Sequence, residues 1–570
     1  MKELLRFLRP HLLLTILSPV FVTVEVVAEL IQPDIMSGIV NEGVLGGNTS
    51  IILPEGIKML IITLVGMLGG VLSIIAAGHV AYSFGADMRS AVFRKISYLS
   101  FSSIDNLQTG SLITRMTSDV SRVQSVIQAS MRLLYRAPFM FIGAIFMVLS
   151  IDLGISSILL ILLPILTFSI IFILKKSFPL FMVVQQRTDR LNTVVQETLA
   201  GVRVIKAYGQ EEREKKRFAQ ANNDLIETNL KVSRRIILLG PVMSLILNIG
   251  IAVIVYYGAR LVEAQSINVG DIMACTNYLT QILMSLMMAS HVIMSMTEAK
   301  ASLSRINEVL LTENNIAQSA GNKAFAPSAN AIQFDNVSFK YDPNSASYTL
   351  RNISFGIGSG QTIAIVGGTG SGKSTLALLM ARFYDATEGR ISISGTDINK
   401  LSTNELRRHV GIVMQQSFLF SGTIADNLRW GRPDATDDDI ICACKQAQIY
   451  DFVQSLPDGI NQQVSQQGVN LSGGQRQRLA IARTLIGRPD ILILDDCLSA
   501  VDLKTEALLR QTLKELPATK VIIAQRISTI KDADLILILE NGELVDQGTH
   551  DKLLQRCGIY REICESQQSV

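Results

Sequence analysis

The sequence predicts a multidomain membrane protein, in which a six-helix transmembrane domain with long cytosolic helical extensions is followed by an α/β domain. Hydrophobic residues make up 48% of the 570 residues and charged residues only 18%, whereas soluble domains usually carry about 25%. Six long apolar stretches precede residue 300, and short apolar strands alternate with helical segments after it. We therefore expect a transmembrane domain at 1–310, a linker at 311–330 and the α/β domain at 331–570.

Each apolar stretch is a candidate membrane span, because about 20 apolar residues cross the roughly 30 Å of hydrocarbon. The six are Leu12–Ile31, Met59–Val80, Ala137–Ile151, Leu153–Leu174, Ile236–Ala259 and Ile272–Thr297. The third is short, so we expect it to begin earlier, with Arg132 and Arg136 snorkelling towards water. A buried soluble helix could explain one such run but not six in succession.

A short amphipathic segment precedes the first span. Lys2, Arg6 and Arg9 share one helical face and Leu4, Leu5 and Leu8 another, which predicts an interfacial helix that Pro10 breaks. No small-residue cleavage site follows a short apolar run, so the first span is not expected to be a removed signal peptide.

Loop charges predict that both termini and the C-terminal half are cytosolic. The loop after the first span has Asp34, Glu42 and Glu55 against Lys58, whereas residues 175–235 hold 13 Lys and Arg against 7 Asp and Glu. We expect this basic region to form long helices that carry motion to a soluble partner. Its run Glu212–Arg217 is interpreted as a solvated helix face rather than an RNA-binding patch.

The composition also excludes several classes of protein. Abundant Leu, Ile and Val exclude a fibrous or disordered chain, and a net charge of +3 is too small to indicate a nucleic-acid partner. Cys442 and Cys444 form a single C-x-C without a second pair, so reduced cytosolic thiols are expected rather than a metal site.

The strongest motif is a phosphate-binding loop. It runs Gly367-Gly368-Thr369-Gly370-Ser371-Gly372-Lys373-Ser374, after the apolar strand Thr362–Val366 and before the helical segment Thr375–Arg382. Glycines let backbone N–H groups turn around phosphate oxygens, and the helix N-terminus adds positive potential. Lys373 would reach the β- and γ-phosphates and Ser374 would hold Mg²⁺. The apolar strand Ile491–Asp495 ends in an acid, so Asp495 is the predicted second magnesium residue.

A second anion-binding element follows about 100 residues later. It is Leu471-Ser472-Gly473-Gly474-Gln475, just before the helical stretch Arg476–Leu485. Two such elements on one domain make sense if the second serves the ATP of a neighbouring domain. Together with the phosphate-binding loop and the strand ending at Asp495, this signature resembles the ATP-binding cassette (ABC) transporters.

The resemblance implies ATP and Mg²⁺ as cofactors and assigns further roles. Tyr341 matches the aromatic residue that stacks on adenine, Gln415 matches the glutamine that joins Mg²⁺ to the membrane domain, and Ser499–Asp502 resembles the D-loop. Segments 104–119 and 197–206 resemble the two intracellular loops of exporters. The implied nucleotide residues are Tyr341, Gly367, Gly368, Thr369, Gly370, Ser371, Gly372, Lys373, Ser374, Thr375, Gln415, Ser472, Gly473, Gly474 and Gln475; Ser374, Gln415 and Asp495 would hold the metal.

Three positions depart from the family pattern. Asp496 stands where Glu usually polarises the attacking water, Gln525 stands where His is usual, and Ser465–Gly468 replaces Gly-Glu-Arg-Gly. The Asp side chain is shorter by one methylene, about 1.5 Å, and a misplacement of about 1 Å can cost roughly 100-fold in rate. Glutamine donates hydrogen bonds but cannot become cationic. Asp496, Gln525 and Asp502 are the candidate catalytic residues.

This pattern is similar to that of the degenerate-site subunit of heterodimeric bacterial multidrug exporters. In such a heterodimer, the phosphate-binding loop and Asp496 of this chain would form a slow ATP site with the partner's signature. Residues 472–475 of this chain would complete the partner's fast ATP site. The alternative is neutral drift in a homodimer that still hydrolyses ATP.

Polar side chains inside the spans are candidate substrate residues. Glu25 and Glu29 lie at i and i+4 and point the same way, and acids inside a span are functional candidates by default. They could bind cations, carry protons or form a gate; alternatively they pair with a group such as His79 or face water. One face of the sixth span carries Asn277, Gln281, Met284 and Met288, which suits varied apolar substrates or is ordinary lipid-facing filler.

The resemblance implies an ABC-type ATPase that exports hydrophobic or amphipathic compounds, drug-like ones among them, by alternating access. Six spans and one cassette form a half-transporter of the plasma or bacterial inner membrane, whose expected partner is a second, non-identical half-transporter. Rival functions are a homodimeric lipid or peptide exporter, the latter weakened because no protease-like domain precedes the first span, and an ATP-gated membrane regulator. The six spans exclude a soluble ABC protein of DNA repair or translation.

Overall fold

The computed structural model describes residues 6–313, 330–343, 345–499, 501–524 and 526–568. The chain divides into two compact units. One comprises Met1–Ser97 with Gly110–Leu311, and the other comprises Tyr98–Thr109 with Thr312–Val570. Most of the expected linker, residues 314–329, lies outside the described residues.

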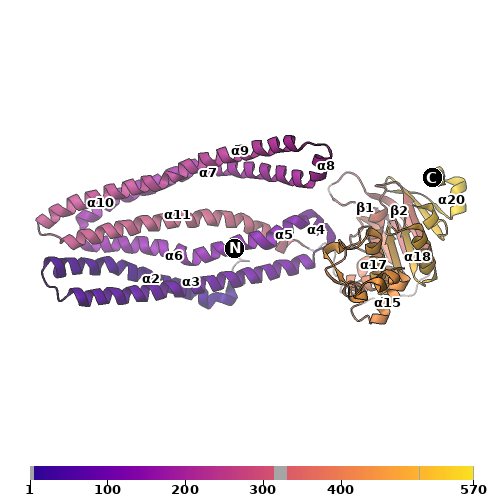
Figure 1. Cartoon of the computed structure of the whole chain (residues 1–570), viewed down its shortest axis with the longest axis horizontal. Helices are drawn as coiled ribbons and strands as arrows, with labels where there is room; N and C mark the ends of the chain where they lie inside the picture. Colours follow the sequence, from indigo (N-terminus) through magenta and orange to yellow (C-terminus); the bar gives the residue numbers. More distant parts are fainter. Residues whose placement is uncertain (1–5, 314–329, 344, 500, 525, 569–570) are drawn as a thin grey trace. The chain divides into compact units, whose positions relative to one another are not determined.

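The first unit consists of long helices that run side by side (Figure 1). Among the described residues, six helical stretches are long and apolar enough to cross a membrane, which confirms the predicted number of spans. The long helices are α2 (Leu12–Gly38), α3 (Ile52–Ser97), α6 (Val120–Ile151), α7 (Leu153–Ala200), α9 (Glu211–Ile237), α10 (Leu239–Glu263) and α11 (Val269–Leu311). The short elements are η1 (Arg9–His11), η2 (Ile39–Leu45), α5 (Thr109–Thr114), η3 (Arg115–Asp119) and α8 (Val202–Ala207).

The regular α-helix is interrupted at Pro10, as predicted. Residues Arg9–His11 form the 3₁₀ turn η1, and His11 has the non-helical angles φ −111° and ψ 18° before α2 begins at Leu12. Proline occupies the first turn of η1, a position where its missing N–H and fixed φ are tolerated. Residues 1–5 lie outside the described part of the chain.

Small residues bring α2 and α3 close together. A Cβ at Gly66 would lie 2.7 Å from the Cβ of Ala28, and one at Gly69 would lie 2.9 Å from the carbonyl oxygen of Phe21. Such contacts drive helix packing where lipid removes the hydrophobic driving force. The core between α2, α6, α7, α10 and α11 is aliphatic and includes Val22, Leu30, Met140, Leu166 and Ile254.

The long basic region predicted after the fourth span forms a helical hairpin. The C-terminal part of α7 packs along α9, and α8 joins them. In Figure 1 this hairpin diverges from α6 and α11 towards α8. Long helical extensions are therefore present, as the sequence predicted.

The second unit is built on a largely parallel sheet, as expected. In the described residues its strand order is β12-β11-β3-β10-β9-β6, with only β12 antiparallel. Strands β9 and β10 are buried throughout, as is typical of a parallel sheet covered on both faces. The strands are β3 (Thr362–Gly367), β6 (Val410–Val413), β9 (Ile491–Asp495), β10 (Thr519–Ile523), β11 (Leu535–Glu540) and β12 (Glu543–Gly548).

A smaller antiparallel sheet and a set of helices complete this unit. The sheet has the order β2-β1-β4-β5 in the described residues. Its strands are β1 (Asn330–Phe339), β2 (Leu350–Gly358), β4 (Glu388–Ile393) and β5 (Thr396–Asp397); β7 (Gly422–Thr423) and β8 (Gln463–Val464) pair separately. The helices are α4 (Phe101–Leu107), α12 (Lys373–Met380), α13 (Thr403–His409), α14 (Ile424–Arg429), α15 (Asp437–Gln446), α16 (Tyr450–Ser455), α17 (Gly473–Leu485), α18 (Leu503–Glu515), α19 (Ile527–Ile530), α20 (His550–Arg556) and α21 (Gly558–Gln568), with 3₁₀ turns η4 (Ile398–Lys400), η5 (Gly459–Asn461) and η6 (Gln466–Gly468).

Candidate nucleotide-binding site

The phosphate-binding loop connects the end of β3 to the start of α12. A Cβ at Gly367 would lie 2.1 Å from the carbonyl oxygen of Leu539 on β11, so only glycine fits there. Gly372 has φ +96°, a conformation that side chains rarely adopt. Gly368, Thr369, Gly370 and Ser371 form the intervening turn. The Ser371 hydroxyl is buried and has no hydrogen-bond partner among the described residues, so the loop fits a ligand with phosphate oxygens.

Lys373 lies across this loop. Its Nζ donates to the carbonyl oxygens of Gly367 at 2.9 Å and Gly368 at 2.7 Å. Burial lowers the pKa of Lys373, although the charges of Asp495 and Asp496 act in the opposite direction. A partly desolvated ammonium held against the loop is well placed to meet phosphate charge.

Ser374 and Asp495 join α12 to the end of β9. Ser374 Oγ donates to Asp495 Oδ1 at 3.1 Å. Burial raises the pKa of Asp495, and the neighbouring Asp496 raises it further, while Ser374 and Lys373 lower it. A hydroxyl and a carboxylate at this spacing are the oxygen ligands that Mg²⁺ takes beside nucleotide phosphates.

Asp496 belongs to the same cluster. Its φ is +45°, its N–H donates to Ile523 O at 2.9 Å, and Ser499 Oγ donates to its carbonyl oxygen at 2.9 Å. Burial raises the pKa of Asp496, whereas Lys373 and a hydrogen bond from the Gln415 side chain lower it. The structure therefore brings Lys373, Gln415, Asp495 and Asp496 together.

Tyr341 stands beside the start of α12. Its hydroxyl lies 3.1 Å from Thr375 Oγ1, and its ring meets the rings of Phe339 at 4.9 Å and Tyr384 at 5.2 Å edge to face. The Tyr341 side chain remains exposed, so a ring face is available next to the phosphate-binding loop.

The signature residues form the N-terminus of α17. Ser472 and Gln475 make a capping box: the N–H of Ser472 donates to Gln475 Oε1 at 2.8 Å, and the N–H of Gln475 donates to Ser472 Oγ at 3.3 Å. Ser472 and Gly473 are exposed and Gly474 is partly exposed. Among the described residues, no hydrogen bond links them to the phosphate-binding loop, so the structure does not bring these two elements together within the chain.

Asp502 caps α18 and faces the signature helix. It accepts a hydrogen bond from the N–H of Thr505 at 3.0 Å. This bond lowers the pKa of Asp502, and the charge of Arg478 on α17 contributes. Ala500 and Gln525 lie outside the described residues, so the predicted role of Gln525 stays a prediction.

Sequence reasoning missed an ion pair behind this cluster. Arg526 donates to Glu506 at 2.5 Å, and Thr529 Oγ1 donates to the same carboxylate at 2.5 Å. The charge of Arg526 also lowers the pKa of Asp496. The available signal was an acid on the apolar face of α18, since Glu506 shares that face with the buried Leu509 and Leu513.

The segment Tyr98–Thr109 packs on the nucleotide unit through α4. Phe101 stacks on Phe383 with ring centroids 4.5 Å apart, and Tyr384 Oη donates to Asp105 at 2.5 Å. Burial and the Asp105 carboxylate raise the pKa of Tyr384. Because Tyr384 also meets Tyr341, α4 is linked to the candidate adenine site by two contacts. The sequence identified Asp105 but neither Phe383 nor Tyr384.

The two acids of the first span pair with arginines of α6. Arg136 contacts Glu25 through Nη1 and donates to Glu29 Oε1 at 2.7 Å through Nη2, and Arg132 donates to Glu25 at 3.4 Å. Both arginines thus pair with the acids, while the predicted snorkelling towards water stays a prediction. The ring of His79, which the sequence suggested as a partner, lies near that of His11, 6.5 Å away.

The candidate face of the sixth span divides between exposed and packed residues. Asn277 is exposed and bonds back to Met273 O, whereas Gln281 Nε2 donates to Glu29 O at 3.3 Å. Met284 is exposed and Met288 is partly buried. Gln281 Oε1, Glu25 Oε2 and Arg132 Nε are buried and have no partner among the described residues.

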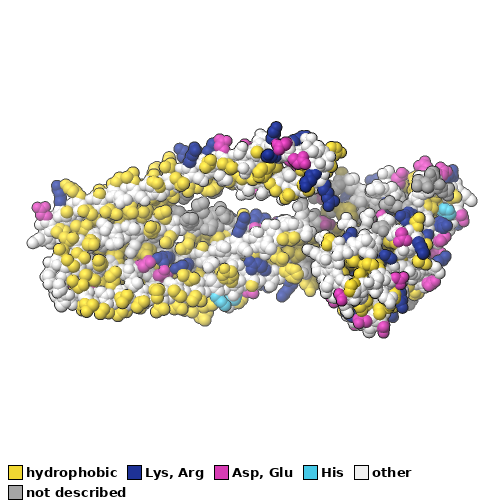
Figure 2. Space-filling view, viewed as in Figure 1, with side chains coloured by type: hydrophobic (Ala, Val, Ile, Leu, Met, Phe, Trp, Pro, Cys, Tyr) yellow, Lys and Arg dark blue, Asp and Glu magenta, His cyan; other side chains and the backbone are white. Residues whose placement is uncertain are grey.

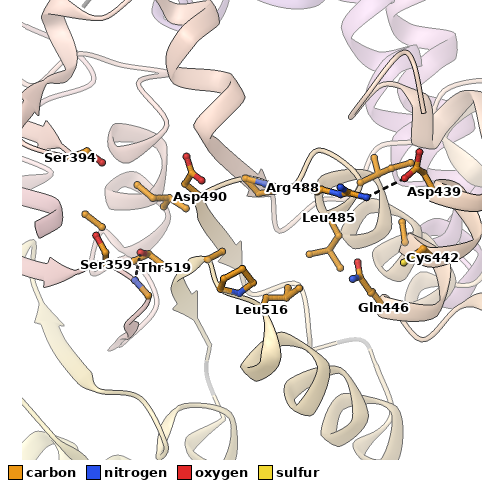
Figure 3. A pocket seen from close by; sticks show the side chains of 18 residues that line it. Ser359, Ser394, Asp439, Cys442, Gln446, Leu485, Arg488, Asp490, Leu516 and Thr519 are labelled. Carbon is orange, nitrogen blue, oxygen red and sulfur yellow. Dashed lines mark hydrogen bonds and ion pairs between the residues drawn. The ribbon is translucent and has the colours of Figure 1, made fainter. Parts of the chain in front are cut away.

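A further cavity lies elsewhere on the nucleotide unit. Figure 3 shows this pocket of about 580 Å³, with Arg488 directed towards Asp439 and Ser359 near Thr519. It borders the beginnings of β9 and β10, the sheet edge opposite to the phosphate-binding loop. Cys442 lines it and is free, as are the other five cysteines. Among the described residues no group of His, Cys, Asp and Glu is arranged to hold a metal.

Comparisons with known proteins cover almost the whole chain. Residues 15–286 match the ABC transporter transmembrane region and residues 350–499 match the ABC transporter domain. The uncharacterized ABC transporter ATP-binding protein YfiB of Bacillus subtilis is 40% identical over 567 residues, 100% of this chain and 98% of that protein. A fatty acid ABC transporter ATP-binding/permease protein of Mycobacterium tuberculosis is 34% identical over 84% of this chain and 75% of its own length. The structure of a bacterial Atm1-family ABC exporter with ATP bound superposes with a TM-score of 0.81 at 29% identity, covering 98% of both chains.

Proposed function

Because the chain belongs to the ABC transporter family, we propose that it is one half of an exporter that moves hydrophobic or amphipathic compounds out of the cell. One observation carries this proposal. A single chain combines six spans with a nucleotide unit, and the signature of that unit is exposed and makes no hydrogen bond to its own phosphate-binding loop among the described residues. The nucleotide unit is an ABC-type ATPase domain and the membrane unit has the exporter fold.

ATP would occupy the loop between β3 and α12. Loop amides, the unpartnered Ser371 hydroxyl and Lys373 would hold its phosphates, Ser374 and Asp495 would hold Mg²⁺, and the exposed Tyr341 ring would stack on adenine. ATP supplies the free energy of γ-phosphate hydrolysis. The residues of this chain bind the nucleotide and orient it.

The chain's own site would hydrolyse ATP slowly, because the carboxylate of Asp496 is one methylene too short to reach the attacking water as a glutamate carboxylate would. Its backbone is held on both sides, by Ile523 through the N–H and by Ser499 through the carbonyl. A backbone shift that compensates for the missing methylene would break these bonds. Loss of a positioned general base costs about 10²–10⁴-fold in rate.

A partner half-transporter would complete both ATP sites. The exposed Ser472 and Gly473 need a facing nucleotide, which a second cassette supplies. The α8 end of the hairpin also has exposed apolar side chains: Leu199, Val204 and Tyr208 are 68%, 60% and 76% exposed, and such patches mark interaction sites. Because the competent catalytic residue must then come from the partner, a non-identical partner fits better than a second copy.

The membrane cluster favours substrates without a strong net positive charge. Glu25 and Glu29 both contact Arg136, and Glu25 also contacts Arg132, so two arginines balance the two acids and leave little net negative charge to hold a cation. The fatty acid transporter among the relatives suggests a second candidate class, amphipathic anions. Arg132 favours it, because its side chain is 30% exposed and reaches an acid only at 3.4 Å.

The loop charges support an orientation in which both termini and the nucleotide unit lie on the cytosolic side of the plasma or bacterial inner membrane. Inside-out vesicles therefore test the function directly. Vesicles containing this chain and its partner should accumulate a fluorescent amphipathic dye when Mg-ATP is added outside, and vesicles with Lys373→Ala in this chain and the matching lysine replaced in the partner should not. ATP binding without any ATP-dependent accumulation of dye or fatty acid would favour the ATP-gated regulator instead.

A further inference from the structure

A groove lies between α7 and the junction of α9 with α10, where apolar sequence changes to charged sequence on both sides. It has a volume of about 360 Å³, and its lining includes Phe168, Phe172, Lys176, Arg235, Leu238 and Val242. In Figure 2 the surface over α10 is largely hydrophobic, and Lys and Arg side chains begin over α9. The groove thus has an apolar part and a cationic mouth.

The cationic mouth lies at the expected membrane surface. Lys175 and Lys176 are the first charged residues after the apolar run of α7, and Arg234 and Arg235 are the last before that of α10. Lys176 follows the start of α7 by about 35 Å at 1.5 Å per residue, slightly more than the roughly 30 Å of hydrocarbon. These cations therefore reach the level of the lipid phosphates while the aromatic rings stay among the acyl chains.

Contacts within the groove position the side chains of Lys176 and Arg235. Arg235 Nη1 donates to the carbonyl oxygen of Lys176 at 3.1 Å, and Lys176 Nζ lies 5.7 Å from the centroid of the Phe172 ring. Phe168 stacks beside Phe172 at 6.0 Å. Within the described residues, no acid forms an ion pair with Lys176 or Arg235, so both charges are available to an anion.

We propose that this groove binds an anionic phospholipid of the cytosolic leaflet. Its phosphate lies between Lys176 and Arg235, and one acyl chain follows Phe168, Phe172 and Val242. Basic pockets between membrane helices on the cytoplasmic side bind such headgroups, whereas a free phosphate would leave the apolar lining uncovered. The inference rests on the proposed orientation of the membrane unit, and it adds a lipid site to the proposed transport function.

The test is direct lipid binding to the full chain, purified with its partner in detergent. Native mass spectrometry follows titration with phosphatidylglycerol and, separately, with phosphatidylcholine. Each surface cation contributes about fivefold to anionic lipid binding, so Lys176→Gln with Arg235→Gln should weaken phosphatidylglycerol binding about 25-fold and leave phosphatidylcholine unchanged. The matched control, Lys175→Gln with Arg234→Gln, removes the same charge from residues that do not line the groove.

A second variant tests the apolar half without changing charge. Val242→Phe fills the groove and should also weaken phosphatidylglycerol binding, while inorganic phosphate should not compete with the lipid. Equal losses in the groove and control variants would show general surface attraction and overturn the proposal. Tighter binding of oleate than of phosphatidylglycerol, or lipid bound only when the partner is absent, would overturn it too. Because binding is measured directly, these outcomes do not depend on ATPase activity or transport.

Discussion

Ser374 Oγ donates a hydrogen bond to Asp495 Oδ1 at 3.1 Å, which joins the first turn of α12 to the end of the buried strand β9. The carboxylate is desolvated, and burial raises its pKa above the ordinary value. In the absence of a cation the ionised carboxylate therefore costs stability. Magnesium at these two oxygens would recover that cost, so the site is arranged for a metal-bound nucleotide rather than for the stability of the free protein.

Asp495→Asn should therefore raise the thermal unfolding temperature of the nucleotide-free protein at neutral pH and remove the further rise that Mg-ATP produces. A raised carboxylate pKa means that the folded state holds its proton more tightly. The contribution of Asp495 to stability is then most favourable at low pH and falls as pH rises from about 4 through the raised pKa. The difference in unfolding temperature between variant and parent should thus grow with pH in that window. Asp434→Asn, an exposed carboxylate, is the control and should show no such trend.

Asp496→Glu should restore hydrolysis at this chain's own site. With Gln525→His added and the partner's catalytic glutamate replaced by glutamine, ATP turnover by the pair should rise at least about tenfold over the same pair without these two changes, because one methylene corrects the reach. In the pair with an unchanged partner, Asp496→Asn should leave ATP turnover unchanged. Steady-state phosphate release measures the turnover of both variants. If turnover does not rise in the double variant Asp496→Glu with Gln525→His, then Asp496 and Gln525 are not the cause of a slow site.

Tyr384→Phe should weaken the coupling of substrate to ATP hydrolysis. It removes the hydrogen bond to Asp105 but keeps the ring against Phe101 and Tyr341. Hydrogen bonds to charged groups contribute about 1.5–3 kcal/mol, so stimulation of ATPase by a transported dye should fall severalfold while basal turnover persists. Tyr348→Phe, which removes a comparable bond to Glu388 at 2.7 Å, is the matched control. An equal loss in the two variants would contradict a specific role for Tyr384.

Arg136→Gln should destabilise the membrane unit strongly. It leaves Glu25 and Glu29 without their shared partner, and an uncompensated buried charge costs about 3–5 kcal/mol. The unfolding midpoint in detergent should fall, and it should recover when Glu25→Gln and Glu29→Gln are added. Arg132→Gln should lower the midpoint less, since that side chain is more exposed and its contact is longer. Similar midpoints for the two single variants would contradict the bridging role of Arg136.

The sequence predicted those features that local patterns determine. Apolar length alone identified six spans, and the glycine spacing from Gly367 to Gly372, with flanking strand and helix, located the phosphate-binding loop. Pro10 marked the interruption before α2, because proline disrupts the hydrogen bonds of a regular α-helix.

Contacts between distant residues could not be predicted in the same way. Arg136 and Glu25 are 111 residues apart and Tyr384 and Asp105 are 279 apart, so no periodicity or motif relates them. The arginines were assigned to water because snorkelling is the usual solution near a helix end. The ion pairs with Glu25 and Glu29 become visible only when α2 and α6 are seen to pack together.

The most direct test of the asymmetric heterodimer is the steady-state ATPase rate of this chain, measured first on the chain purified alone and then on the chain co-expressed with its partner half-transporter. An asymmetric heterodimer should show little activity from this chain alone and strong activity from the pair. The activity of the pair should be abolished when the partner's catalytic glutamate is replaced and should be insensitive to Asp496→Asn. Robust turnover by this chain alone would contradict the asymmetric heterodimer and make Asp496 a working catalytic residue in a homodimer.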